Sequence, residues 1–539
     1  MEKQFEKYSH IPQEKFALVS NREIHDLKLD TKPIGYFKDA FRRFCKNKGS
    51  VVAAFIIMFL ILFAIVGPFV SKYETTFNDI NLSYYLPKSE TFSFLGWDGY
   101  SRKDDVNMKD IIQYRAIELE TGETVIKETY DSYFTITQQG KEFIKDVYYS
   151  IYENSYTKNL MRYVQLTPEE YKKLQEYQDA NQVQVIYPMV KYESIKYKNE
   201  VESLYKDDAN VWYERIDSDA KGKDRLNKGM PVGFTTDDDL EEIIAGLKPA
   251  YLPYSGKDGY TSSMRLKTED GLQYDYARRI AAGKDDVNYM VRVNYNKYHD
   301  FLYGHGEPTF LFGSDKFGKD LFVCLSSGAR FSLFFAICIA AINLFIGAIY
   351  GAIEGYYGGV TDMVMERFSD VLGNVPFMVV VTLFKLHIAD KVGTVATLLF
   401  AFVLTGWIGM ASTTRMQFYR YKNQEYVLAA RTLGASDGRI MFKHIFPNAL
   451  GTLITSSVLV IPGVIFSESS LSYLGIINLS TSSTTSVGTL MATARGSLST
   501  YPHAILFPAI FIALLMITFN LFGNGLRDAF NPSLRGAED

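Results

Sequence analysis

Long apolar runs that contain no charge are the feature that most restricts how this chain of 539 residues can fold. The first run, Val51–Val70, reads VVAAFIIMFLILFAIVGPFV. A helix of about 20 such residues crosses a hydrocarbon core of roughly 30 Å. Runs of this kind recur only after residue 325, so the overall 47% of hydrophobic residues hides a very uneven distribution. The sequence therefore predicts a mostly α-helical polytopic membrane protein.

The spacing of the apolar runs predicts six transmembrane helices. The first lies within 49–72, and the other five are expected at 331–351, 371–387, 392–411, 445–466 and 503–522. Basic residues gather in Phe41–Lys48, before the first run, and again in 412–446. Short inner loops carry such an excess of Lys and Arg. We therefore expect the segment 1–48, the loops 352–370 and 412–446, and the tail 531–539 to be cytoplasmic. The first run is expected to be an uncleaved anchor, because no small-x-small cleavage site follows it.

The polar segment 73–310 is expected to form an extracellular domain inserted between the first and second transmembrane helices. Asp146–Tyr152 reads DVYYSIY, which is typical of a strand. Thr167 followed by Pro168 is a helix start, and it predicts a helix through YKKLQEYQDA. A second helix, EEIIAGL, is expected after the acidic residues 237–239, which lack the alternating ligands of a calcium loop. The sequence thus predicts an α+β domain.

Composition argues against several classes of site. The net charge of −4 does not favour a nucleic-acid partner. Cys45, Cys324 and Cys338 do not have the spacing of metal ligands, so no metal site is expected. Gly313-x-x-x-x-Gly318-Lys319 resembles a nucleotide-binding loop, but Asp320 stands where the Mg²⁺-ligating Ser or Thr would be. We interpret this match as coincidental, because the topology places it outside the cell.

The inner loop between the fourth and fifth apolar runs has the local pattern of a helix, a turn and a second helix. Residues 424–450 read QEYVLAARTLGASDGRIMFKHIFPNAL. Glu425 opens the first helix, and Gly434 can take the left-handed conformation that ends it. Ser436 is a natural N-cap for the second helix, and Pro447 opens the fifth transmembrane helix. Small side chains at Ala429, Ala430 and Ala435 allow another surface to approach closely, although an ordinary basic inner loop would fit the same pattern.

The loop closely resembles the EAA loop of ABC importer permeases, and in particular that of the oligopeptide and dipeptide permease group. The matching residues are Ala429, Ala430, Arg431, Leu433, Gly434, Ala435, Ser436, Asp437, His444, Ile445, Pro447 and Asn448. Leu428 occupies the position of the motif glutamate, and Glu425, one turn away, is a candidate replacement. Further segments match in order over 311–532, including the stretch from Gly313 to Asp320, the stretch from Gly355 to Gly359, and Asp362.

The resemblance implies a non-catalytic transmembrane subunit of an ATP-driven peptide importer. Such a subunit pairs with a second, homologous permease chain and with two ATPase subunits, which bind ATP and Mg²⁺. An extracellular or periplasmic binding protein delivers the peptide, and the complex lies in a bacterial plasma membrane. The residues implied to contact the ATPase are Glu425, Ala429, Ala430, Arg431, Gly434, Ala435 and Ser436. No cofactor is expected on this chain itself.

Some alternatives remain open from the sequence. Glu468, near the outer end of the fifth run, is a candidate for the substrate path. A residue exposed at the membrane boundary, or one that caps a turn, would fit the same position and is the commoner case. The segment 73–310 could dock the binding protein, shield the pathway, contact peptide or serve as a scaffold. A membrane-anchored extracellular sensor without transport activity is the alternative function, and it would not require five further spans.

Overall fold

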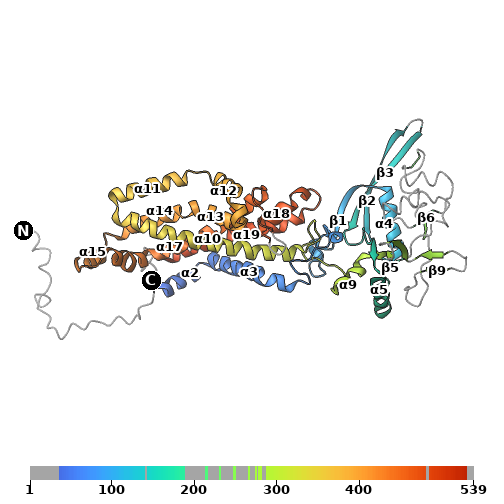
Figure 1. Cartoon of the computed structure of the whole chain (residues 1–539), viewed down its shortest axis with the longest axis horizontal. Helices are drawn as coiled ribbons and strands as arrows, with labels where there is room; N and C mark the ends of the chain where they lie inside the picture. The colour runs from blue at the N-terminus through green and yellow to red at the C-terminus, as the bar shows by residue number, and fades with distance from the viewer. Residues whose placement is uncertain are drawn as a thin grey trace, which may run out of the picture.

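The computed structural model describes residues 36–139, 142–187, 287–480 and 485–530, together with short strands between 213 and 281. The molecule is elongated, with a helical bundle at one end and a β-rich unit at the other (Figure 1). Helix α15 (Glu425–Thr432) lies at the end of the bundle that is farthest from the strands (Figure 1). We refer to these two ends as the loop end and the strand end.

The bundle is made of long apolar helices and several short ones. The long helices are α3 (Lys48–Val70), α10 (Leu321–Tyr357), α12 (Phe377–Val392), α13 (Thr394–Gly406), α14 (Ile408–Tyr421), α17 (Phe446–Tyr473) and α19 (His503–Phe530). The other helices of the bundle are α2 (Tyr36–Lys46), α11 (Gly359–Gly373), α16 (Asp437–Arg439) and α18 (Val487–Ala494), with a π-helical turn, η6 (Ile440–Ile445). Short 3₁₀ turns are η3 (Ile80–Leu82), η4 (Ser93–Leu95) and η7 (Arg495–Ser497).

Among the described residues, five helical stretches are long and apolar enough to cross a membrane, and a sixth exists if α11 and α12 count as one bent span. Two of the five are composite, because α13 continues into α14 and α16 continues through η6 into α17. Several predicted spans are therefore shorter than the helices that contain them. Span 331–351, for example, is the middle of α10, a helix of 37 residues.

Two sequence predictions about the third span are wrong. The third span, expected at 371–387, is not one continuous helix with these bounds, because it falls across α11 and α12, which meet at an angle of 72°. Pro376 lies at this break; it has no backbone N–H to continue the helical hydrogen bonding. The loop expected at 352–370 is also almost entirely helical, since α10 extends to Tyr357 and α11 begins at Gly359.

Helix α10 occupies the centre of the bundle and packs against α3, α14 and α17. Gly347, Gly351 and Gly355 form a stripe of small residues on one side of α10, against α14. A Cβ atom at Gly351 would lie 2.1 Å from the carbonyl oxygen of Ala411, which no real contact permits. Small residues at this spacing let two helix backbones approach closely in a membrane. The contact fixes the position of α14, from which the loop end begins.

The β-rich unit contains helices and strands that lie between α3 and α10 in the chain. Its helices are α4 (Met108–Thr121), α5 (Pro168–Asn181) and α9 (Tyr295–Tyr303). One antiparallel sheet has the order β1 (Tyr100–Asn107), β3 (Glu142–Asn154), β2 (Ile126–Gln139), and β7 (Met230–Pro231) also pairs with β3. A second sheet has the order β11 (Ala277–Ala281), β12 (Val287–Asn294), β4 (Met161–Leu166), and β5 (Ile186–Tyr187) pairs with β12. Two small pairs are β9 (Arg265–Lys267) with β10 (Gln273–Asp275), and β6 (Tyr213–Arg215) with β8 (Leu247–Pro249).

The local predictions for this unit have different outcomes. The strand expected at 146–152 is confirmed as part of β3. The helix after Thr167 is confirmed as α5, and Thr167 and Glu170 form a reciprocal capping box. The helix EEIIAGL lies outside the described residues except for Leu247, which is in β8.

Tyrosine side chains form much of the hydrophobic core of the β-rich unit. The buried tyrosines of this core are Tyr73, Tyr85, Tyr156, Tyr171, Tyr295 and Tyr298, packed with Phe310 and several aliphatic residues. The hydroxyl of Tyr156 donates to the carbonyl of Leu86 at 2.8 Å, and that of Tyr295 donates to Asp79 at 2.6 Å. Buried tyrosines usually have such a partner for the hydroxyl. These tyrosines therefore pack in the core of the unit, and the role of the unit stays a prediction.

The segment 313–320 joins the β-rich unit to the bundle. Its Asp315 carboxylate accepts from the backbone N–H groups of Phe317 and Lys319 at 2.8 and 2.9 Å. Asp320 caps α10 through the N–H of Phe322, and it accepts a 2.7 Å hydrogen bond from Ser71 at the end of α3. The N–H groups of Phe317 and Lys319, which a nucleotide-binding loop would present to phosphate, are thus satisfied by this chain's own carboxylate. This geometry agrees with a coincidental sequence match.

We predict that Gly351→Ala destabilises the bundle. The added methyl group would overlap the α14 backbone, and overpacking of this kind costs about 1–3 kcal/mol, more than the roughly 1 kcal/mol that alanine gains over glycine in a helix. The melting temperature of the purified protein in detergent measures the effect. Gly463→Ala in α17 is the matched control, because no atom lies within 4 Å of a Cβ at that position. Equal melting temperatures for the two variants would contradict the close contact.

We predict that Asp320→Asn weakens the dependence of stability on pH. Burial raises the pKa of Asp320 from 3.8 to about 6, so the folded chain binds this proton more tightly than the unfolded chain. The free energy of unfolding therefore falls by about 1–3 kcal/mol as the pH rises from about 4 to above 6. Asparagine can still cap α10 and accept from Ser71 without a charge. Comparing melting temperatures near pH 5 and near pH 7.5 tests this, with Glu169→Gln, exposed at the start of α5, as control. An unchanged slope in Asp320→Asn would contradict it.

Candidate functional site: the exposed segment at the loop end

Residues 424–446, called the loop segment below, form the exposed part of the loop end. The loop expected from residue 412 starts later than predicted, because 412–421 belong to α14. Helix α15 runs from Glu425 to Thr432, and a turn then leads into α16 and η6. The predicted helix, turn and second helix are confirmed, but the second helix is continuous with the transmembrane helix α17.

The turn of the loop segment has the geometry expected from Gly434. Gly434 has φ +82°, in the left-handed region that costs glycine no steric strain. The N–H of Ala435 donates to the carbonyl of Ala430 at 3.1 Å, and the N–H of Gly434 donates to that of Arg431 at 3.0 Å. Ser436 takes the N-cap position with extended backbone angles, but its side chain makes no capping hydrogen bond. The turn is therefore fixed by backbone hydrogen bonds and by glycine.

The seven residues predicted from the sequence lie together on this turn and on α15. The exposed residues are Glu425, Ala429, Arg431, Gly434 and Ser436, and Ala430 and Ala435 are half-buried. Leu433 beside them is 88% exposed, and Leu428, at the position of the motif glutamate, is 44% exposed. A surface with small residues and two exposed leucines is suited to contact with another protein. That these residues contact an ATPase stays a prediction.

The opposite side of the loop segment is anchored in the bundle. Val427 is fully buried in a cluster with Ile440, Met441, Ile445 and residues of α10 and α14. The hydroxyl group of Tyr356, near the end of α10, donates to Asp437 at 2.6 Å, and the guanidinium of Arg431 lies 5.8 Å from the Tyr356 ring centroid. Lys422, just before the loop segment, donates to the carbonyl of Gly355 at 3.0 Å. These contacts attach the loop segment to α10 as well as to its own neighbours in the chain.

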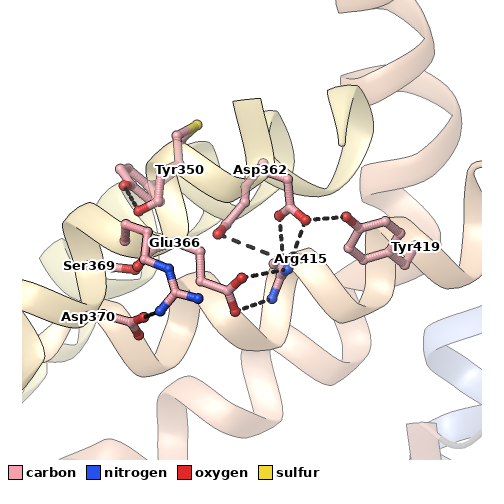
Figure 2. Close-up of polar contacts among 10 residues, drawn as sticks. Tyr350, Asp362, Glu366, Ser369, Asp370, Arg415 and Tyr419 are labelled. Carbon is pink, nitrogen blue, oxygen red and sulfur yellow. Dashed lines mark hydrogen bonds and ion pairs between the residues drawn. The ribbon is translucent and has the colours of Figure 1, made fainter. Parts of the chain in front are cut away.

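Arg415 forms a second polar cluster at the loop end, one that sequence reasoning did not find. Its guanidinium donates to both oxygens of Asp362 at 2.6 and 2.8 Å, and to both oxygens of Glu366 at 2.9 and 3.2 Å. Figure 2 shows these contacts between α14 and α11, with the Tyr419 hydroxyl donating to Asp362 at 2.6 Å. The sequence identified Arg415 only as one basic residue of an inner loop. Its acidic partners lie about 50 positions earlier, which no local pattern reveals.

Glu468 lies inside the bundle at the strand end. It is 1% exposed, so the alternative of a residue exposed at the membrane boundary is wrong. Its carboxylate accepts from Ser486 at 2.7 Å, from Ser472 at 2.9 Å and from Ser332 at 3.4 Å. These serines come from the start of α18, from α17 and from α10, so Glu468 joins three segments. Its role in a substrate path stays a prediction.

The described residues contain no group of three His, Cys, Asp or Glu side chains placed to hold a metal ion. The carboxylates that do gather at the loop end surround Arg415. Chemically, the loop end offers a contact surface and an ion-pair network, and the described part of it has no cluster of the kind that holds a catalytic metal.

Comparison with known proteins identifies the family. Residues 343–536 match the family described as binding-protein-dependent transport system inner membrane component, and 35–87 match the N-terminal TM domain of oligopeptide transport permease C. The chain is 43% identical over 224 residues to the oligopeptide transport system permease protein OppC of Bacillus subtilis, covering 42% of this chain and 72% of that protein. It is 41% identical over 226 residues to the dipeptide transport system permease protein DppC of Bacillus subtilis, covering 42% and 69%. The chain belongs to the oligopeptide and dipeptide ABC transporter permeases.

The family matches cover most of the bundle and leave out most of the β-rich unit, including all of its described strands. The loop segment, Arg415 and Glu468 all lie within the match at 343–536, while 88–342 falls between the two matches. That interval contains the described strands and the first part of α10. A solved structure of the MetNI methionine ABC transporter aligns with 38% of this permease and 94% of that chain, at 14% identity and a TM-score of 0.31.

We predict that Val427→Ala loosens the loop segment of this permease. Removing two buried methyl groups leaves a cavity and costs about 1–3 kcal/mol. Hydrogen exchange of residues 425–446, followed by mass spectrometry, should show faster exchange there, while α3 and α19 keep their rates. Leu428→Ala is the matched control, since that side chain is 44% exposed. Equal exchange in both variants would show that Val427 does not anchor the segment.

Proposed function

We propose that this chain is the transmembrane permease subunit of an ATP-driven peptide importer, and that it forms half of the translocation pathway. The observation that carries the proposal is the loop segment: an exposed turn with left-handed Gly434, anchored in the bundle by Val427 and Tyr356, within a family match. The relatives at more than 40% identity are named as oligopeptide and dipeptide transport permeases, which supports peptide as the cargo.

The loop segment docks into separate ATPase subunits, which carry ATP and Mg²⁺. Its contact residues are Glu425, Ala429, Ala430, Arg431, Gly434, Ala435 and Ser436. Closure of the ATPases pushes this rigid segment, and the attached α14 and α17 move as rigid bodies to exchange inward and outward openings. The chain itself catalyses no reaction. Glu425 takes the place of the motif glutamate that Leu428 replaces.

The chain lies in a bacterial plasma membrane with both termini in the cytoplasm. The basic residues Arg420, Lys422, Arg431, Arg439 and Lys443, in and beside the loop segment, support a cytoplasmic loop end by the positive-inside rule. The β-rich unit is at the opposite end of the bundle (Figure 1), so the same orientation makes it an extracellular α+β domain. It serves as a scaffold near the mouth of the pathway, because many of its tyrosines are buried in its own core.

The functional complex contains a second, homologous permease subunit, two ATPase subunits and an extracellular or periplasmic peptide-binding protein. Exposed apolar residues on α11 and α12, among them Met363, Phe368 and Leu386, favour contact with lipid or with the second permease. A membrane-anchored extracellular sensor without transport activity would not need five further apolar spans, nor a loop segment anchored at the end of the bundle opposite to the β-rich unit. The permease function therefore explains more of the molecule.

We predict that Gly434→Pro abolishes uptake coupled to ATP hydrolysis while membrane insertion is retained. Proline holds φ near −65°, which is incompatible with the observed +82° at this turn. Ala430→Arg should have the same effect by placing a large side chain in the contact surface. The measurement is peptide uptake and peptide-stimulated ATP hydrolysis by the complete complex in lipid vesicles, together with co-purification of the ATPase subunits.

Gly438→Ala is the matched control for these two variants. A Cβ atom at Gly438 would meet no atom within 4 Å, as at Gly434, but Gly438 has no positive φ. This variant should therefore retain uptake and the ATPase subunits. Wild-type coupling in Gly434→Pro and in Ala430→Arg would refute the role of the loop segment.

A further inference from the structure

Helix α11 has unusually few packing contacts within this chain. Only Ser369 of its residues is buried, and the apolar residues Val360, Val364 and Val371 are 76%, 62% and 71% exposed. At its start, Gly358 and Gly359 have φ values of +64° and +58°, and at its end the chain bends by 72° into α12. Helix α11 is therefore a separate helix with a break in the chain before it and another after it. Apolar packing within the described chain contributes little to its position.

Polar contacts hold α11 in place. Figure 2 shows Arg415 of α14 between Asp362 and Glu366, which are one helical turn apart on α11. The exposed fractions of the three side chains are 23%, 13% and 42%, so the network is partly shielded from water. The Tyr350 hydroxyl of α10 adds a 2.6 Å hydrogen bond to the carbonyl of Met365. Bidentate contacts between arginine and carboxylates are strong and fix direction as well as distance.

Arg415 also lies close to the base of the loop segment. The backbone of Arg415 contacts the glycine stripe, since a Cβ at Gly355 would lie 2.8 Å from its carbonyl oxygen. Phe418, one turn further along α14, belongs to the buried cluster that anchors Val427. A displacement of the loop segment therefore reaches Arg415 through packed side chains and a short stretch of helix.

We propose that Arg415 is a positioning residue that makes α11 move together with α14. The proposal rests on the proposed function, in which the loop segment is displaced by the ATPase. With the Arg415 contacts in place, this displacement is passed to α11 and onward to the bent helix α12. Without these contacts, α14 moves and α11 does not follow, because the chain can bend at the breaks before and after α11. Less peptide is then transported for each ATP hydrolysed.

The first experiment measures peptide taken up per ATP hydrolysed by the complete complex in lipid vesicles. Arg415→Gln should lower this ratio about tenfold, within the usual range of coupling between sites. Arg415→Lys keeps the charge but cannot contact both carboxylates bidentately, and it should fall between Gln and wild type. Arg367→Gln is the matched control, because Arg367 pairs at 3.1 Å with Asp370 of the same helix. A merely structural role for Arg415 would reduce the amount of complex and leave the ratio unchanged.

A second experiment measures the coupling of the two helices directly. Spin labels at Val364 of α11 and Met416 of α14, both more than half exposed, report their separation after the three cysteines are replaced by alanine. The distance distribution should be narrow in wild type with and without nucleotide, and broad in Arg415→Gln and in Asp362→Asn. Narrow distributions in these variants, or a wild-type uptake ratio in Arg415→Gln, would overturn the proposal.

The two proposals fail in different ways. If wild type and Arg367→Gln couple uptake to ATP hydrolysis and Arg415→Gln does so equally well, only the role of Arg415 is refuted. If wild type hydrolyses ATP without any uptake, the proposed function is refuted and the role of Arg415 with it. If Arg415→Gln does not assemble, Arg415→Lys and Asp362→Asn decide the question by the same two measurements.

Discussion

The close contact between α10 and α14 is the constraint on which the loop end depends. Three glycines spaced four residues apart bring the two backbones together, and a methyl group at Gly351 would collide with the α14 carbonyl at Ala411. Because lipid tails are as apolar as the helices, such packing relies on contact between surfaces rather than on exclusion of water. The contact fixes the position of α14 against α10. It therefore places Arg415 beside α11 and Phe418 beneath the loop segment.

The two ends of the bundle use polar groups in different ways. At the strand end, Asp320 and Glu468 are buried, and hydroxyl and backbone donors of neighbouring segments satisfy them. Buried carboxylates with several hydrogen bonds fix one arrangement, because leaving them unsatisfied is costly. At the loop end, the contacts of Arg415 and Tyr356 lie at the boundary with solvent. Polar contacts at a boundary can hold helices together while allowing them to move as a group, as the proposed function requires.

The sequence predicted the exposed residues of the candidate site, but it did not predict the buried and ion-paired residues that anchor them to the bundle. The left-handed turn at Gly434 and the helix start at Glu425 follow from local rules, and the structure confirms both. The burial of Val427 and the partners of Arg415 depend on α10 and α11, more than 40 residues away in the chain, so local rules are silent on them. The three glycines are spaced four residues apart in the sequence, but only the structure shows that they lie against α14.

The sequence by itself determined that the chain has membrane-length apolar helices, a polar segment between the first two, and a helix–turn–helix before the fifth. Charge, hydrophobicity and glycine act over a few residues, and these features need nothing more. The tertiary structure decided the bend between α11 and α12, the burial of Glu468 and the pairing of Arg415 with α11. The last two depend on which helices become neighbours, and that is set by packing between segments far apart in the chain. The bend lies at Pro376, a local break whose angle of 72° no local rule gives.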